Sequence, residues 1–232
     1  MQKIPIDLLL FDVDGTLVDS RNDIANAMNF ALRAVGVPEK RHEEIVSYIG
    51  TGVIDLVRRS LGAGYSDLAE QAIEIFSGYY LEHSADTSKL YPHVKETLEY
   101  FKDKIKFILT NRYAKFADAT LTQLGIRKYF ENIIGGDDEN CMKPSPCILE
   151  KVFSGTGINR DKIMIVGDMS IDINTGKSAG TRTCWVTYGL GKIGDVEALK
   201  PDYIIDDIKE LKDIIAPSSA SDRRAPGTKF KK

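Results

Sequence analysis

The chain has 232 residues, of which 43% are hydrophobic and 28% are charged, and its formal net charge is −3. This composition is typical of a globular protein with a sizeable core, built as one large domain or as one domain with a smaller insert. The charge gives no electrostatic case for nucleic acid or an anionic membrane as a partner, and no apolar run approaches the length of a membrane span.

The cysteines predict neither a disulfide framework nor a zinc site. Cys141, Cys147 and Cys184 are an odd number and form no C-x-x-C pair. We therefore expect reduced thiols in a cytoplasmic protein. We expect no signal peptide at the N-terminus, because Asp7 interrupts the first apolar segment and no cleavage pattern follows.

The first strong pattern is the run LLLFDVDGTL at residues 8–17. Its four leading apolar residues predict a strand that is buried on both faces, as in a parallel sheet. Side chains two residues apart in an extended chain point to the same side, so Asp12 and Asp14 can face one cavity while Val13 packs into the core. Gly15 lets the backbone turn close to a bound group. Ligands of open α/β sheets lie beyond the carboxyl ends of strands, so we predict an active-site edge here.

Residues 19–87 contain predicted helices and no predicted strand. The apolar spacing predicts helices over about 20–35, 43–48, 53–61 and 66–83, with Asp19 or Ser20 capping the first and Ser66 capping the last. Four helices between two α/β segments indicate an inserted helical domain.

From about Lys89 onward, predicted strands and helices alternate. We predict strands at 105–109, 133–134, 162–166, 182–187 and 203–205, and helices at 94–101, 114–124, 146–153, 173–179 and 208–215. This alternation implies a parallel sheet with right-handed crossovers. The predicted fold class is therefore α/β, with a Rossmann-like core (1–18 and 88–215), an inserted helical cap (19–87) and a flexible tail (216–232).

Polar side chains follow several of the strand-like runs or stand in the loops beyond them. In chain order they are Asp12 and Asp14, Thr110 with Asn111, Lys143 in the run KPSP, and Asp168 with Asp172. This order resembles the four motifs of the haloacid dehalogenase superfamily of phosphotransferases, over roughly residues 4–215. A chance match of four separate motifs in the right order is improbable.

The clustered acids raise a problem that a metal ion solves. A phosphomonoester is a dianion, and it would be repelled by several carboxylates that also repel one another. A set of oxygen ligands favours Mg²⁺. The resemblance implies that Asp12 and Asp168 supply carboxylates to Mg²⁺, that Asp14 supplies its backbone carbonyl, and that Asp172 acts partly through water.

The resemblance also implies a role for each remaining motif residue. Asp12 would attack phosphorus to form an aspartyl-phosphate, and Asp14 would protonate the leaving oxygen and later deprotonate the hydrolytic water. Thr110 and the backbone N–H of Asn111 would bind phosphate oxygens, and Lys143 would offset the negative charge. The presence of Asp14 favours an oxygen leaving group over carbon–halogen or phosphonate cleavage.

The predicted cap bears on the substrate. Its segment 48–61, YIGTGVIDLVRRSL, is similar to the cap segment of phosphoglycolate phosphatases. A carboxylate could bind the helix N-terminus at Gly52, with Arg58 or Arg59 as its partner; alternatively, the glycines merely turn the chain and the arginines are solvated. A closing cap excludes large substrates, so we expect a small phosphorylated metabolite and a monomer or homodimer.

The sequence thus favours a phosphatase that acts on 2-phosphoglycolate, and it leaves alternatives open. These are a phosphatase for sugar phosphates, nucleotides or pyrophosphate, a mutase of the β-phosphoglucomutase type, and a non-catalytic binding protein on the same fold. The complete set of motif residues argues against a binding protein, and we find no clear set of cap groups that would orient a hexose phosphate for a mutase.

Overall fold

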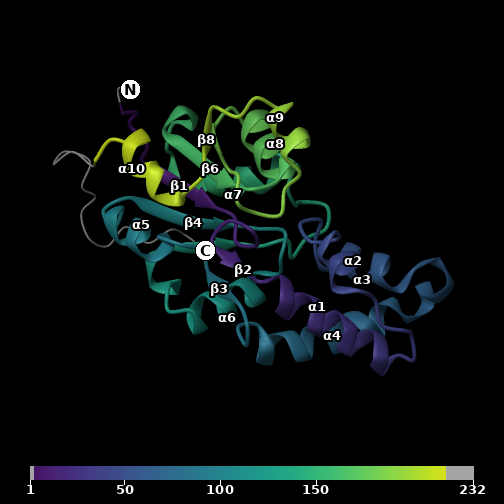
Figure 1. Cartoon of the computed structure of the whole chain (residues 1–232). Helices are drawn as coiled ribbons and strands as arrows, with labels where there is room; N and C mark the ends of the chain where they lie inside the picture. Colours follow the sequence, from purple (N-terminus) through teal and green to yellow (C-terminus); the bar gives the residue numbers. More distant parts are fainter. Residues whose placement is uncertain (1–2, 218–232) are drawn as a thin grey trace.

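The chain forms a six-stranded parallel sheet with helices on both faces and a group of helices at one end (Figure 1). The structure is a computed structural model, and it describes residues 3–217. The sheet has the order β5-β4-β1-β6-β7-β8. Its strands are β1 (Leu8–Phe11), β4 (Ile105–Leu109), β5 (Asn132–Ile134), β6 (Ile163–Gly167), β7 (Arg182–Val186) and β8 (Tyr203–Ile205).

The central strand is β1, which pairs with β4 along one edge and with β6 along the other. Successive side chains of a strand point to opposite faces of the sheet. Leu9 and Phe11 accordingly belong to one apolar cluster, whereas Leu8 and Leu10 belong to another. A run of four apolar residues is therefore what a strand needs when helices cover both faces.

The helices divide between the two faces. One apolar cluster includes side chains of α5, α6 and α10, and the other includes side chains of α7 and α8. Helix α9 packs against α8 through Val196 and Ile173. The bounds of these helices are α5 (Val94–Tyr100), α6 (Ala114–Gln123), α7 (Cys147–Thr156), α8 (Ser170–Ala179), α9 (Ile193–Glu197) and α10 (Leu211–Ile214).

Four more helices lie together beyond one end of the sheet (Figure 1). They are α1 (Arg21–Ala34), α2 (His42–Val46), α3 (Val53–Leu61) and α4 (Ala69–His83). Their own apolar cluster joins Met28 and Leu32 of α1 to Phe76 and Tyr80 of α4. Among the described residues, no helix is long and apolar enough to cross a membrane.

Two helix predictions were wrong at their starts. Helix α4 begins at Ala69 rather than after Ser66, because a 3₁₀ segment at Ala63–Leu68, with a non-helical Tyr65, occupies the residues before it. Helix α8 begins at Ser170 rather than Ile173, because Asp172 accepts a hydrogen bond of 3.0 Å from the backbone N–H of Met169 and so caps this helix start.

The final predicted helix is also shorter than expected. Residues Ile208–Glu210 form a 3₁₀ turn, and only Leu211–Ile214 are α-helical. Of the predicted tail, 216–232, residues 218–232 lie outside the described residues.

The chain leaves the sheet region and returns to it at one place. Two short strands, β2 (Val18–Asp19) and β3 (Lys89–Leu90), pair antiparallel there. Beside them, the buried carboxylate of Asp23 accepts hydrogen bonds of 2.6–3.1 Å from the backbone N–H and hydroxyl groups of Thr87 and Ser88. We propose that this junction separates a cap of residues 19–87 from the core.

Replacing Asp23 with alanine should destabilise the protein by about 3 kcal/mol, because the buried donors of Ser88 and the part-buried donors of Thr87 would lose a charged acceptor. Urea unfolding of Asp23→Ala would measure this loss. The matched control is Asp67→Ala, which removes an exposed carboxylate from the same group of helices and should change stability by no more than about 0.5 kcal/mol. Equal effects of the two substitutions would contradict the structural role of Asp23.

Candidate active site

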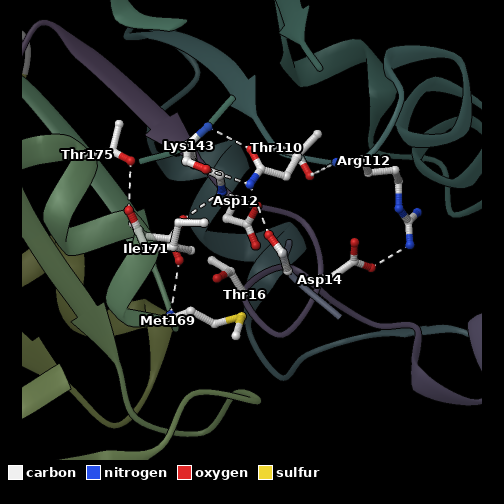
Figure 2. Close-up of polar contacts among 12 residues, drawn as sticks. Asp12, Asp14, Thr16, Thr110, Arg112, Lys143, Met169, Ile171 and Thr175 are labelled. Atoms are coloured by element: carbon white, nitrogen blue, oxygen red, sulfur yellow. Dashed lines mark hydrogen bonds and ion pairs between the residues drawn. The ribbon is translucent and has the colours of Figure 1, made fainter. Parts of the chain in front are cut away.

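Polar side chains meet at the carboxyl edge of the sheet, where three neighbouring strands end. Asp12 follows β1, Thr110 follows β4, and Asp168 follows β6. The chain runs from β1 outward to β4 and β5 and then crosses to β6 on the other side of β1. A crevice forms where the strand order reverses in this way. Figure 2 shows Asp12, Asp14 and Thr110 gathered there, with Lys143 beside them.

Three carboxylates form a buried acidic cluster in this crevice. Asp12, Asp168 and Asp172 each have an oxygen within 4.8 Å of the others. The turn at Gly15, whose φ is +87°, brings its backbone against Asp168. A Cβ atom at this position would lie 2.2 Å from Asp168 Oδ2, so only glycine fits.

The environment of the cluster disfavours its negative charge. Burial, together with the nearby Asp12 and Asp172, raises the pKa of Asp168 well above its usual range. Burial and the charge of Asp12 also raise the pKa of Asp172, to about 6, although Lys143 opposes this shift. The chemistry of this donor set, with clustered carboxylate oxygens in need of positive charge, fits a hard divalent cation.

Lys143 is the cation that touches this cluster. Its Nζ atom donates to Asp12 Oδ1 at 2.7 Å and to Asp172 Oδ1 at 2.6 Å. Burial disfavours the charged ammonium, but the two carboxylates outweigh burial and raise the pKa of Lys143. The lysine therefore stays charged inside the protein and offsets part of the negative charge.

Asn111 positions the loop that carries Lys143. Its side-chain Oδ1 accepts from the backbone N–H of Lys143 at 2.8 Å, and its Nδ2 donates to the backbone oxygen of Lys143 at 2.9 Å. The same Nδ2 donates to the backbone oxygen of Gly50, from the helical group, at 3.0 Å. One side chain thus connects the end of β4, the lysine loop and the predicted cap.

The same loop carries a disulfide between Cys141 and Cys147, on either side of Lys143. The expectation of three reduced thiols was therefore wrong for this pair, and only Cys184, which is buried, is free. The disulfide could not be predicted from the sequence, because the two cysteines are six residues apart and form no recognised motif. The turn of the loop brings them together.

Asp14 lies beside the acidic cluster, in a cavity between the sheet edge and the helical group. Ser20 Oγ and Arg112 Nη2 both donate hydrogen bonds to Asp14 Oδ1. Burial raises the pKa of Asp14, and the Arg112 guanidinium opposes this rise. Asp14 is thus a buried carboxyl with a raised proton affinity that still faces the cavity.

The remaining predicted residues lie at different depths. Thr110 is buried and lines the cavity. Gly52, the residue just before α3, also lines the cavity. The side chain of Arg58 is 63% exposed and lies 3.6 Å from Glu139, outside this cavity. Arg59 lies over the ring of Tyr48 at 4.2 Å. The structure therefore does not bring either arginine to the carboxylates.

Sequence reasoning missed three residues that hold the site. Thr16 Oγ1 donates to Asp168 Oδ1 at 2.9 Å, and Ser20 and Arg112 contact Asp14. Two of them were close to recognised motifs, since Thr16 is in the run DVDGT and Arg112 follows Thr110 and Asn111 directly. Their proximity to the motifs was a usable signal, but their partners could not be inferred from it.

Comparisons with known proteins agree with this geometry. A sequence model of the family described as haloacid dehalogenase-like hydrolase matches residues 9–186. The chain is 35% identical over 228 residues to a phosphoglycolate phosphatase of Vibrio parahaemolyticus, covering 94% of this chain and all of that relative. It is 36% identical over 188 residues to a phosphoglycolate phosphatase of Aquifex aeolicus, covering 80% of this chain and 87% of that relative.

A solved structure has the same fold. The crystal structure of a predicted phosphoglycolate phosphatase from Haemophilus somnus superposes with a TM-score of 0.84 at 32% identity, covering 90% of this chain and 97% of that chain. The protein belongs to the haloacid dehalogenase-like hydrolases. The predicted α/β fold class and the predicted enzyme class, a hydrolase similar to phosphoglycolate phosphatases, are confirmed.

The raised pKa values predict how pH affects the stability of the metal-free protein. A carboxyl whose folded-state pKa lies above its unfolded value stabilises the fold when protonated, and this contribution is lost as pH rises through the folded-state pKa. For Asp172, with a pKa of about 6, the loss between pH 4 and pH 7 corresponds to about 2 kcal/mol. Urea unfolding in a chelator should show this decline.

The control for this prediction is Asp168→Asn, which removes one repelling charge from the acidic cluster. We expect a flatter decline with pH in this variant, because Asp168 itself has a raised pKa and its carboxyl no longer contributes to the loss of stability. A divalent cation should raise the stability of the unmodified protein more at pH 7.5 than at pH 5. Parallel pH profiles for the two proteins would contradict this account of the cluster.

Proposed function

We propose that the protein is a Mg²⁺-dependent phosphatase that hydrolyses small phosphomonoesters, with 2-phosphoglycolate as its substrate. The observation that carries the proposal is that two carboxylates, Asp12 and Asp14, line one cavity and that Lys143 donates a hydrogen bond to Asp12. The identity to phosphoglycolate phosphatases over nearly the whole chain supports the choice of substrate.

Asp12 is the proposed nucleophile. One of its carboxylate oxygens forms a bond to phosphorus while the bond from phosphorus to the ester oxygen breaks, which gives an aspartyl-phosphate. Lys143, at 2.7 Å from Asp12 Oδ1, offsets the negative charge of the transferring group. Thr110 lines the same cavity, and its hydroxyl is the proposed donor to a phosphate oxygen, as is the backbone N–H of Asn111.

Asp14 is the proposed general acid and base. A raised pKa favours a protonated carboxyl, which can give its proton to the departing ester oxygen. The resulting carboxylate then takes a proton from the water that attacks the aspartyl-phosphate, and Asp12 is restored. The hydrogen bond from Ser20 fixes the orientation of Asp14 through both steps.

The carboxylates of Asp12, Asp168 and Asp172, with the backbone carbonyl of Asp14, are the proposed ligands of Mg²⁺. When bound, the cation supplies positive charge that lets a dianionic phosphate approach the carboxylates and stabilises the transferring phosphoryl group. Thr16 Oγ1 donates to Asp168 Oδ1 at 2.9 Å and would hold this carboxylate in place for the ion. Gly15 keeps the backbone close enough to Asp168 for a shared site.

The helical group restricts the size of the substrate. Apolar side chains on its inner side, among them Ile49, Val53, Leu56 and Phe76, line the cavity opposite the carboxylates. Such a wall excludes water from the reacting atoms and leaves no room for a folded protein. We further propose that the enzyme acts in the cytoplasm, because a doubly charged ester crosses a bilayer poorly, and that it is a monomer or homodimer.

The substrate can be tested by kcat/KM in Mg²⁺ over a panel of 2-phosphoglycolate, hexose phosphates, nucleoside monophosphates and pyrophosphate. We expect 2-phosphoglycolate to lead by at least tenfold, and Asp12→Asn to lower every activity by at least about 1000-fold. Even turnover across the panel would contradict the substrate but not the phosphatase class. Activity that survives in Asp12→Asn would contradict the nucleophile.

The acid role of Asp14 can be tested with Asp14→Asn on two esters. For an alkyl phosphate, whose leaving oxygen needs a proton, kcat/KM should fall by about 10²–10⁴-fold. For 4-nitrophenyl phosphate, whose leaving group departs readily as an anion, the fall should be much smaller. An equal fall for both esters would indicate that Asp14 serves the site in some other way than as an acid.

A further inference from the structure

The cavity contains a second cation that the proposed mechanism does not use. Among the described residues that line it, the cationic side chains are Lys143 and Arg112. Lys143 is already paired with Asp12 and Asp172 at the end where phosphorus must lie. Arg112 lies at the Asp14 end of the cavity, toward which Figure 2 shows its guanidinium directed.

The guanidinium of Arg112 is held firmly in place. Only 7% of the residue is exposed. Its Nη1 donates to Thr120 Oγ1 at 3.0 Å, its Nη2 donates to Asp14, and its Cζ lies 5.1 Å over the ring of Tyr80. A guanidinium has five N–H donors, so these two bonds leave donors for a ligand. Arg112 is therefore a preorganised, desolvated cation beside the proposed acid.

The position of Arg112 matches the shape of a short carboxylated substrate. If phosphorus lies at Asp12 and the leaving oxygen at Asp14, the rest of the leaving group must extend past Asp14, away from Lys143. In 2-phosphoglycolate a single methylene separates that oxygen from the carboxylate carbon. A buried arginine binds a carboxylate through two parallel N–H donors. The other groups at this end include Phe76, Tyr80 and Phe116, which offer a carboxylate no charge.

We propose that Arg112 is the residue that recognises the carboxylate of the substrate and so sets specificity for short phosphorylated carboxylic acids. This inference rests on the proposed function, and it differs from the interpretation in which Arg58 or Arg59 is the partner of the carboxylate. Arg58 is mostly exposed, is paired with Glu139 and lies outside the cavity. Arg112 is buried inside it and lies next to the proposed acid.

The test compares two substrates that differ only in the recognised group. One is 2-phosphoglycolate, and the other is 2-hydroxyethyl phosphate, in which a CH₂OH group replaces the carboxylate. The measured quantity is the ratio of their kcat/KM values in the unmodified enzyme, in Arg112→Met and in Arg112→Lys. A ratio cancels any general damage to Asp14 that both substrates share.

In Arg112→Met we expect the ratio to fall by about 100-fold, mainly through a higher KM for 2-phosphoglycolate. Arg112→Lys should recover part of this loss, because a lysine keeps the charge without the two parallel donors. The matched control is Arg33→Met, which removes a mostly exposed arginine, paired with Glu39, from α1. The ratio should not change in this control.

Two outcomes would overturn the inference in distinguishable ways. If the unmodified enzyme prefers 2-phosphoglycolate and Arg112→Met slows both substrates equally, Arg112 only positions Asp14, and the proposed function stands. If the unmodified enzyme shows no preference for the carboxylated substrate, the proposed substrate fails, and the role of Arg112 fails with it.

A binding measurement covers the case in which Arg112→Met does not fold. Calorimetric titration of 2-phosphoglycolate into Asp12→Asn, with and without Arg112→Lys, measures recognition without turnover. Arg112→Lys should weaken binding of 2-phosphoglycolate at least fivefold and should leave binding of 2-hydroxyethyl phosphate within twofold. Equal weakening of both ligands would overturn the assignment.

Discussion

The site depends on one ammonium group that is buried between two carboxylates. Lys143 contacts Asp12 and Asp172, and all three side chains are nearly inaccessible to water. Charges in such a place are costly unless they are paired with good geometry. The pairing requires that the end of β1, the start of α8 and the loop after β5 converge within hydrogen-bond distance. The order of strands in the sheet, with β1 between β4 and β6, brings these segments together.

The burial of one lysine among three carboxylates leaves the site with unbalanced negative charge. A lysine offsets one charge, whereas Asp12, Asp168 and Asp172 carry up to three. Burial, together with the neighbouring carboxylates, raises the pKa values of Asp168 and Asp172. A fold that only needed stability would replace these groups with apolar ones. Keeping them buried is instead what an enzyme needs when its ligands are a divalent cation and a phosphate dianion, because both interact more strongly where water is excluded.

The sequence predicts best what local patterns determine. Strand β1 follows from four apolar residues in a row, and α3 was predicted at its observed bounds because glycines 52 and 62 flank it. The start of α4 was missed because residues 63–68 form a 3₁₀ segment that has no distinct pattern in sequence. The contact of Arg112 with Asp14 spans 98 residues, and only the tertiary fold determines which carboxylate an arginine meets.

Asn111 bonds the lysine loop and the helical group through separate hydrogen bonds. Two of its hydrogen bonds hold the backbone of Lys143, and a third reaches Gly50 in the helical group. Displacing the helical group breaks only the third, a single neutral bond worth about 1 kcal/mol. The two bonds to the lysine loop do not reach the helical group, so its displacement would leave them intact. Release of a product therefore need not disturb the ion pair between Lys143 and Asp12, on which the proposed chemistry depends.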